Sequence, residues 1–99
     1  MLHIVNKSPY ECSGLQSCLR VAQPGSAVLL IEDGVYGASA GEATESALRG
    51  ARGKLRFYAL APDIEARGMQ GRVVQGVELV DYAGFVDLVT SHEVVQSWL

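Results

Sequence analysis

The sequence predicts an α/β fold in which a mainly parallel sheet of four to five strands lies between two layers of helices. Short apolar segments alternate with amphipathic helical segments, which is typical of βαβ units joined by right-handed crossovers. Residues 27–31 form a continuous apolar run, as expected for a strand that helices cover on both faces. With 99 residues and 48% hydrophobic composition, the chain has the size of a single domain, residues 1–99.

The first strand and the first helix are expected near the N-terminus. Residues 2–5 form a short apolar segment, and Pro9 ends it because proline cannot donate a ladder hydrogen bond. Ser13 and Gln16 fit the S-x-x-Q capping box that begins a helix, and Pro24 ends that helix. One helix face is apolar at positions i, i+3, i+4 and i+7, namely Leu15, Cys18, Leu19 and Ala22.

The central strand is expected over residues 26–32, and Asp33-Gly34 then turns the chain. The small residues 37–41 lead into a second helix, predicted over residues 42–49. Residues 50–53 form a loop before the next strand.

Two more strand and helix pairs follow. Residues 54–60 alternate between two faces, which predicts a third strand, and Pro62 suits the first turn of a short helix that Gly68 ends. Residues 77–80 form a fourth strand. Asp81 can cap the last helix, whose apolar face repeats at Tyr82, Phe85, Val86 and Val89.

Composition argues against several classes of protein. The formal net charge is −3 and no cluster of Lys and Arg occurs, so we expect no direct nucleic-acid binding. No apolar run approaches the roughly 20 residues of a membrane-spanning helix. The N-terminus lacks the basic start and the cleavage site of a secretory signal, so a cytoplasmic location is expected.

The carboxyl ends of the predicted strands carry no known cofactor motif, although ligands of open α/β sheets gather there. Neither G-x-x-x-x-G-K-[ST] nor G-x-G-x-x-G occurs, and G-x-S-x-G is absent too, so we expect no nucleotide cofactor and no serine hydrolase. Glu32 and Asp33 could form an acid/base pair. Adjacent strand residues point to opposite faces, however, which favours a solvated loop with Asp33 as a turn residue.

Two cysteines and two histidines are the remaining candidates for chemistry. Cys12 and Cys18 are not in a C-x-x-C arrangement, and His3 and His92 stand alone, so no metal site is predicted. Free thiols are expected of an intracellular protein. His3 should lie within the first strand, and His92 should end the last helix.

Cys18 has two interpretations that the pattern leaves open. Its place on the apolar helix face favours packing as a small hydrophobic residue. A reactive role requires thiolate character, which Arg20 could promote if the thiol is exposed. Cys12 is expected to be more exposed, near the positive end of the same helix.

Three aromatic residues also call for interpretation. Trp98, followed by Leu99, either folds back on the domain or enters an interface, because large apolar groups left in water indicate a contact. Tyr36 and Tyr58 are interpreted as packing at the core and its rim.

Four blocks of sequence together resemble one family. They are MLHIVNKSP at residues 1–9, LLIEDGVY at 29–36, YALAPDIEARG at 58–68 and VDYAGFVDL at 80–88. These blocks, in this order and with a tryptophan near the C-terminus, are similar to the TusB/DsrH family from end to end. The resemblance implies a DsrE-like fold.

The family resemblance implies a subunit of a sulfur-relay complex. In such a heterohexamer, three related subunits each occur twice, and the partners would be TusC/DsrF-like and TusD/DsrE-like subunits. The complex accepts persulfide sulfur from a TusA-like donor and passes it to a TusE/DsrC-like acceptor. In one branch the sulfur serves 2-thiolation of the tRNA wobble uridine, and in the other it serves sulfur oxidation.

The resemblance also bears on Cys18, which matches the cysteine found in DsrH-type members and missing from many TusB-type members. It implies that the principal persulfide cysteine lies on the TusD/DsrE-like subunit, with Cys18 as a secondary sulfur site. A self-sufficient sulfurtransferase that uses Cys18 or Cys12, a purely structural subunit and a stand-alone ligand-binding domain remain the alternatives. A homo-oligomer of the isolated chain is compatible with the leading interpretation.

Overall fold

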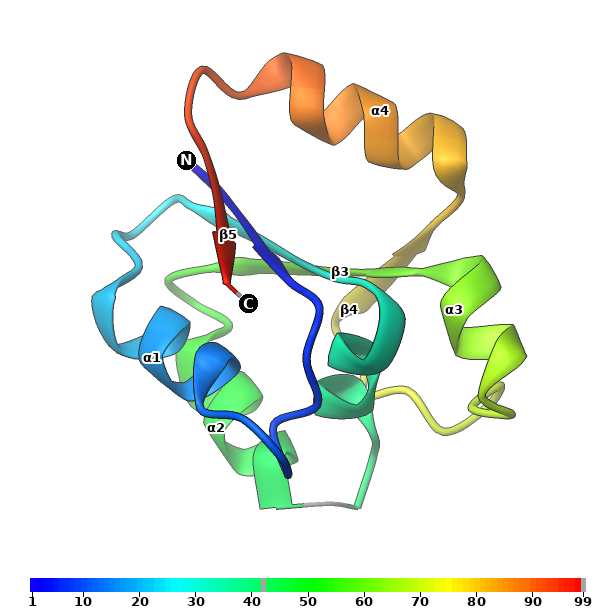
Figure 1. Ribbon diagram of the computed structural model, residues 1–99. Helices are drawn as coiled ribbons and strands as arrows, with labels where there is room; N and C mark the ends of the chain where they lie inside the picture. The colour runs from blue at the N-terminus through cyan, green and yellow to red at the C-terminus, as the bar shows by residue number, and fades with distance from the viewer. Residues whose placement is uncertain (42, 99) are drawn as a thin grey trace.

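The computed structural model describes residues 1–41 and 43–98 and contains one sheet of five strands (Figure 1). The strands lie in the order β4-β3-β2-β1-β5, and every neighbouring pair is parallel. This confirms the predicted mainly parallel sheet. The strands are Leu2–Val5 (β1), Ala27–Leu30 (β2), Arg56–Leu60 (β3), Val77–Val80 (β4) and Val95–Trp98 (β5).

β2 lies in the middle of the sheet, as its unbroken apolar sequence predicts. All four of its residues are buried, and it pairs with β1 on one side and β3 on the other. Such a strand must be apolar on both faces because both are covered. Ile31 extends the pairing, since its N–H donates to the Val5 carbonyl oxygen at 3.0 Å.

Helices cover both faces of the sheet and create three layers (Figure 1). This confirms the predicted three-layer α/β sandwich. Among the described residues, α4 (Tyr82–Ser91) is the helix that covers the second face. The helices on the first face are α1 (Gly14–Val21), the 3-10 helix η1 (Glu32–Ala38), α2 (Ala43–Ala51) and α3 (Ala61–Ala66).

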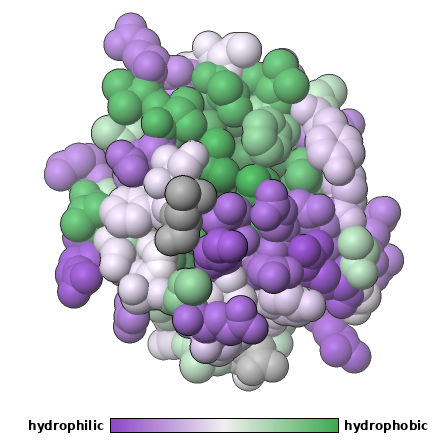
Figure 2. Space-filling view, in the orientation of Figure 1, coloured by the Kyte–Doolittle hydropathy of each residue, from purple (hydrophilic) through white to green (hydrophobic). Residues whose placement is uncertain are grey.

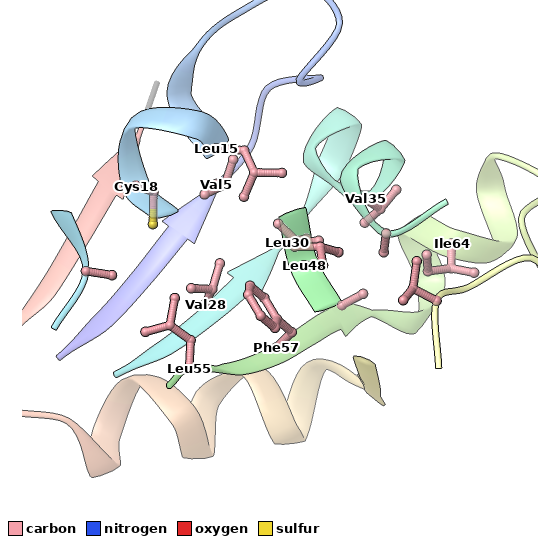
Figure 3. Close-up of a cluster of buried hydrophobic side chains, with 14 of the residues drawn as sticks. Val5, Leu15, Cys18, Val28, Leu30, Val35, Leu48, Leu55, Phe57 and Ile64 are labelled. Carbon is pink, nitrogen blue, oxygen red and sulfur yellow. The ribbon is translucent and has the colours of Figure 1, made fainter. Parts of the chain in front are cut away.

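The two faces carry cores of unequal size. The larger core draws on β1, β2, β3, all the helices of the first face and the segment after α3 (Figure 3). The smaller core, beneath α4, contains three buried residues. These are Leu2, Ala27 and Leu29. No residue of α4 itself is buried, so the second face is thinly covered.

The segment after β2 differs from the prediction of a turn at Asp33-Gly34 followed by a loop of small residues. It forms η1, which is pressed against the end of β1. A Cβ atom on Gly34 would lie 2.1 Å from the Val5 carbonyl oxygen. Small residues in this segment therefore allow a close approach that a sequence pattern does not reveal.

Other differences concern element ends. Ser13 is the N-cap of α1, but its side chain makes no capping hydrogen bond, so the predicted capping box does not form. β3 begins at Arg56 rather than at residue 54, because the N–H groups of Lys54 and Leu55 both donate to the Ala51 carbonyl oxygen. Residue 42, the expected start of the second helix, lies outside the described residues.

β5 is a strand that the hydrophobic periodicity does not predict. It pairs with β1, placing Trp98 opposite Val5. Of the two alternatives for Trp98, the structure shows the one in which it folds back on the chain. Leu99 lies outside the described residues.

Candidate functional site

Cys18 lies on the face of α1 that packs against the sheet (Figure 3). Its exposed fraction is 0%, and it packs in the same cluster as Val5, Leu15 and Val28. Burial raises the pKa of the thiol from 9.0 to about 11. A neutral, inaccessible thiol is a poor nucleophile, because the thiolate is the reactive form. In this conformation Cys18 can fill space but cannot accept sulfur.

Cys12 contrasts with Cys18 because it is exposed, in the loop that leads into α1. Its N–H donates to the Ser8 carbonyl oxygen at 3.0 Å. Both cysteines are free thiols, as expected. The more accessible thiol is therefore the one that the family resemblance does not single out.

At the carboxyl ends of β2 and β3, Arg67 links two carboxylates. Its Nε and Nη2 atoms donate to Asp33 Oδ1 at 3.0 and 2.9 Å, and its Nη1 lies 3.8 Å from Asp63 Oδ1. Asp63 also accepts a 2.7 Å hydrogen bond from the N–H of Glu32, which has a positive φ of 50° that is uncommon outside glycine.

Asp33 is therefore engaged in an ion pair with Arg67, and the structure gives no support to an acid/base pair of Glu32 and Asp33. The sequence analysis missed Arg67. The available signal was its spacing of four residues from Asp63 on α3. Because the Asp33 side chain is 56% exposed, this ion pair between η1 and the end of α3 contributes little to the stability of the fold.

His3 lies within β1, as predicted, and is buried. Its Nδ1 accepts a hydrogen bond from Trp98 Nε1, while its buried Nε2 has no partner among the described residues. Burial, and secondly the positive N-terminal amine, lower the pKa of His3. A hollow of about 370 Å³ adjoins it, between the ends of β1, β5 and α1.

The remaining predicted positions have structural roles. His92 is the C-cap of α4, with its Nδ1 2.7 Å from the Leu88 carbonyl oxygen. Tyr36 and Tyr58 are half-buried and pack against the larger and the smaller core, respectively, which confirms their interpretation. Within residues 1–41 and 43–98, no three His, Cys, Asp or Glu side chains gather as a metal site would require.

The surface around α4 has no counterpart among the predicted sites. Figure 2 shows hydrophobic side chains gathered over and beside this helix. We call this surface the apolar strip. Its members lie on α4, on β1 and β5 or just after β2: Ile4, Ile31, Tyr82, Phe85, Val86, Val89 and Val95.

Several members of the apolar strip are well exposed. Tyr82 is 63% exposed, Val86 56% and Val95 40%. With the half-buried members, the strip leaves on the order of 400 Å² of apolar surface in water, which is the size of the largest apolar patch on a typical monomer, a patch that is often functional. A helix that is apolar on more than its packed face is normally covered by another element.

Comparison with known proteins identifies the family. The profile described as "DsrH like protein" matches residues 7–95. The chain belongs to the TusB/DsrH family. The chain is therefore one of the sulfur-relay subunits that the sequence resemblance indicates.

Relatives named Protein TusB align along the whole chain. The protein from Pectobacterium parmentieri is 39% identical and that from Escherichia coli K12 is 35% identical. Both alignments cover 99% of this chain and 100% of the relative.

Solved structures share the fold. The crystal structure of the ychN protein from E. coli superposes with a TM-score of 0.85 at 18% identity, covering 98% of this chain and 97% of that one. A protein of unknown function from Methanobacterium thermoautotrophicum gives a TM-score of 0.75 at 20% identity, covering 97% and 95%. Identities this low establish the fold and nothing about activity.

No described helix has the length and hydropathy needed to span a bilayer. The longest, α4, has 10 residues.

Proposed function

We propose that this chain is the assembly and docking subunit of a heterohexameric sulfur-relay complex of the TusBCD/DsrEFH type. Its partners are a TusC/DsrF-like and a TusD/DsrE-like subunit, here called the sister subunits. The complex takes persulfide sulfur from a TusA-like donor and hands it to a TusE/DsrC-like acceptor, for tRNA wobble uridine 2-thiolation or for sulfur oxidation. The expected cytoplasmic location is part of this proposal.

The observation that carries the proposal is the apolar strip. A chain that leaves an apolar helix flank and half-buried sheet residues in water gains free energy when another subunit covers them. The burial of Cys18 supports an assembly role as well, because the cysteine that the family resemblance singles out is inaccessible in this chain.

Persulfide transfer sets a clear chemical requirement for Cys18. An acceptor thiolate attacks the terminal sulfur of the donor persulfide. A new sulfur–sulfur bond forms as the donor's bond breaks, and the donor cysteine leaves as a thiolate. Cys18 can act as the proposed secondary sulfur site only after α1 moves to expose it and the thiol loses its proton.

Co-expression tests the assembly role. The chain and both sister subunits, purified together, are expected to give a complex with two copies of each by native mass spectrometry. If the three proteins elute separately at micromolar concentration, the assembly role is wrong.

A second experiment tests Cys18 within that complex. With Cys18→Ala, transfer from a persulfidated donor to the acceptor is expected to continue undiminished. A loss of transfer, together with a gain of about 32 mass units on Cys18 of the unmodified complex, would instead assign sulfur carriage to this residue.

A further inference from the structure

The position of α4 above the sheet determines where the apolar strip lies. Gly84, Asp87 and Ser91 line a hollow beside β4, so this flank of α4 faces the β4 edge of the sheet. Tyr82 and Val86 are four residues apart and lie on the opposite flank. That flank therefore faces β1 and β5.

The sheet beneath that flank is apolar and only partly covered. Residues aligned across parallel strands point to the same face, and Leu2 aligns with Val95 and Ile4 with Ser97. Leu2 belongs to the core beneath α4, so all four side chains point to that side of the sheet. Three of them are apolar, and none is charged.

The dimensions of the uncovered region match one helix. It spans two neighbouring strands, β1 and β5, which lie about 4.8 Å apart and present a width of about 10 Å. A helix with its side chains has a diameter of about 10 to 12 Å, so one helix would complete this layer beside α4. An added strand would instead pair along the free edge of β5 and leave the strip open.

We infer that a helix of a sister subunit, with an apolar face, lies in the apolar strip against β1 and β5. This inference rests on the proposed function and names its docking surface. A standard interface buries about 800 Å² on each partner, of which roughly 57% is apolar. About 450 Å² of each side of such an interface is therefore apolar. The strip exposes roughly 400 Å² of apolar surface, which is close to this area, so it can form the centre of such an interface.

A matched pair of substitutions tests the docking surface in the full chain. Val86→Glu introduces a charge into the strip, where Val86 is 56% exposed. Val21→Glu makes the same change on α1, on the other side of the sheet, where Val21 is 53% exposed. Both positions are on the surface, so circular dichroism should show the same fold and similar melting for both variants.

Val86→Glu is expected to weaken binding to the sister subunits by at least about 100-fold, because a carboxylate would be buried without a partner. Val21→Glu should bind as the unchanged chain does. A photo-crosslinking phenylalanine derivative at position 82 should form its adduct with a helix of a sister subunit.

The outcomes separate this inference from the proposed function. If both variants bind equally well, the docking surface is wrong and the assembly role stands. If the unchanged chain does not bind the sister subunits, the assembly role fails and the inference fails with it. An adduct with a strand, or with a second copy of this chain in the complex, overturns the choice of occupant.

Discussion

The indole Nε1 of Trp98 donates a hydrogen bond to His3 Nδ1 at 3.1 Å, across 95 residues of sequence. The two rings are tilted by 37° with centroids 6.1 Å apart. Because Nδ1 accepts this bond, the proton of the neutral imidazole must lie on Nε2. The contact fixes the tautomer of His3 and holds β5 against β1.

Replacing the indole of Trp98 should show how much this hydrogen bond contributes to the free energy of unfolding. Trp98→Phe keeps an aromatic ring but leaves His3 Nδ1 buried without its donor, which should lower the free energy of unfolding by about 1 to 3 kcal/mol. Chemical denaturation checks this value. The control Gln96→Ala, an exposed position on the same strand, should stay within about 0.5 kcal/mol.

We also predict that His3 makes the folded protein less stable in acid. Burial and the N-terminal amine lower the pKa of His3 below its usual 6.5 in the folded state, so the unfolded chain binds the proton more readily. The contribution of His3 is therefore fully present above about pH 6.5 and declines as the pH falls toward the lowered pKa. Protonation of Nδ1 would also break the bond from Trp98.

Denaturation midpoints measured between about pH 8 and pH 5 check the histidine effect. His3→Asn offers a non-titrating acceptor and should show a shallower decline on the acid side. The two proteins are otherwise identical, so the difference between their slopes reports on position 3 alone. Equal slopes would show that His3 does not link stability to pH.

An added methyl group should have opposite effects on stability at Gly34 and at a second helical glycine, Gly50. Gly34→Ala should cost at least about 3 kcal/mol, since its Cβ would meet backbone atoms of Val5 that cannot move alone. Gly50→Ala lies in α2 with open space around the new methyl group and should stabilise the protein by about 0.5 to 1 kcal/mol. Thermal melts of the two variants should shift in opposite directions.

We predict that the two cysteines are alkylated at different rates. In the folded chain, iodoacetamide should label exposed Cys12 first, because Cys18 is buried and its pKa is raised to about 11. Peptide mass spectrometry over time separates the two rates, and urea should make them similar. Fast labelling of Cys18 in the native chain would show that α1 opens readily.

Much of the fold could be predicted because its signals are local. The apolar run at residues 27–31 indicated a central strand, and Asp81 indicated the start of α4, where its Oδ1 accepts from the Gly84 N–H at 2.8 Å. Capping and periodicity act over a few residues, so one segment of sequence contains them.

The remaining features depend on contacts between distant residues. β5 becomes a strand because β1 offers an edge and His3 offers an acceptor to Trp98, neither of which residues 95–98 reveal. The pairing of Arg67 with Asp33 likewise requires the ends of β2 and β3 to be neighbours. The periodicity placed Cys18 on the packed face but could not show how completely α1 covers it.

The position of β1 inside the sheet has a consequence for folding kinetics. β1 can pair with β2 after closing a short loop, whereas its second partner, β5, requires a loop of nearly the whole described chain. Closing that long loop should therefore be a late step. Until then β1 presents an open edge that can accept β5 from another molecule. Refolding at rising protein concentration should thus yield more strand-exchanged dimers, which light scattering can count.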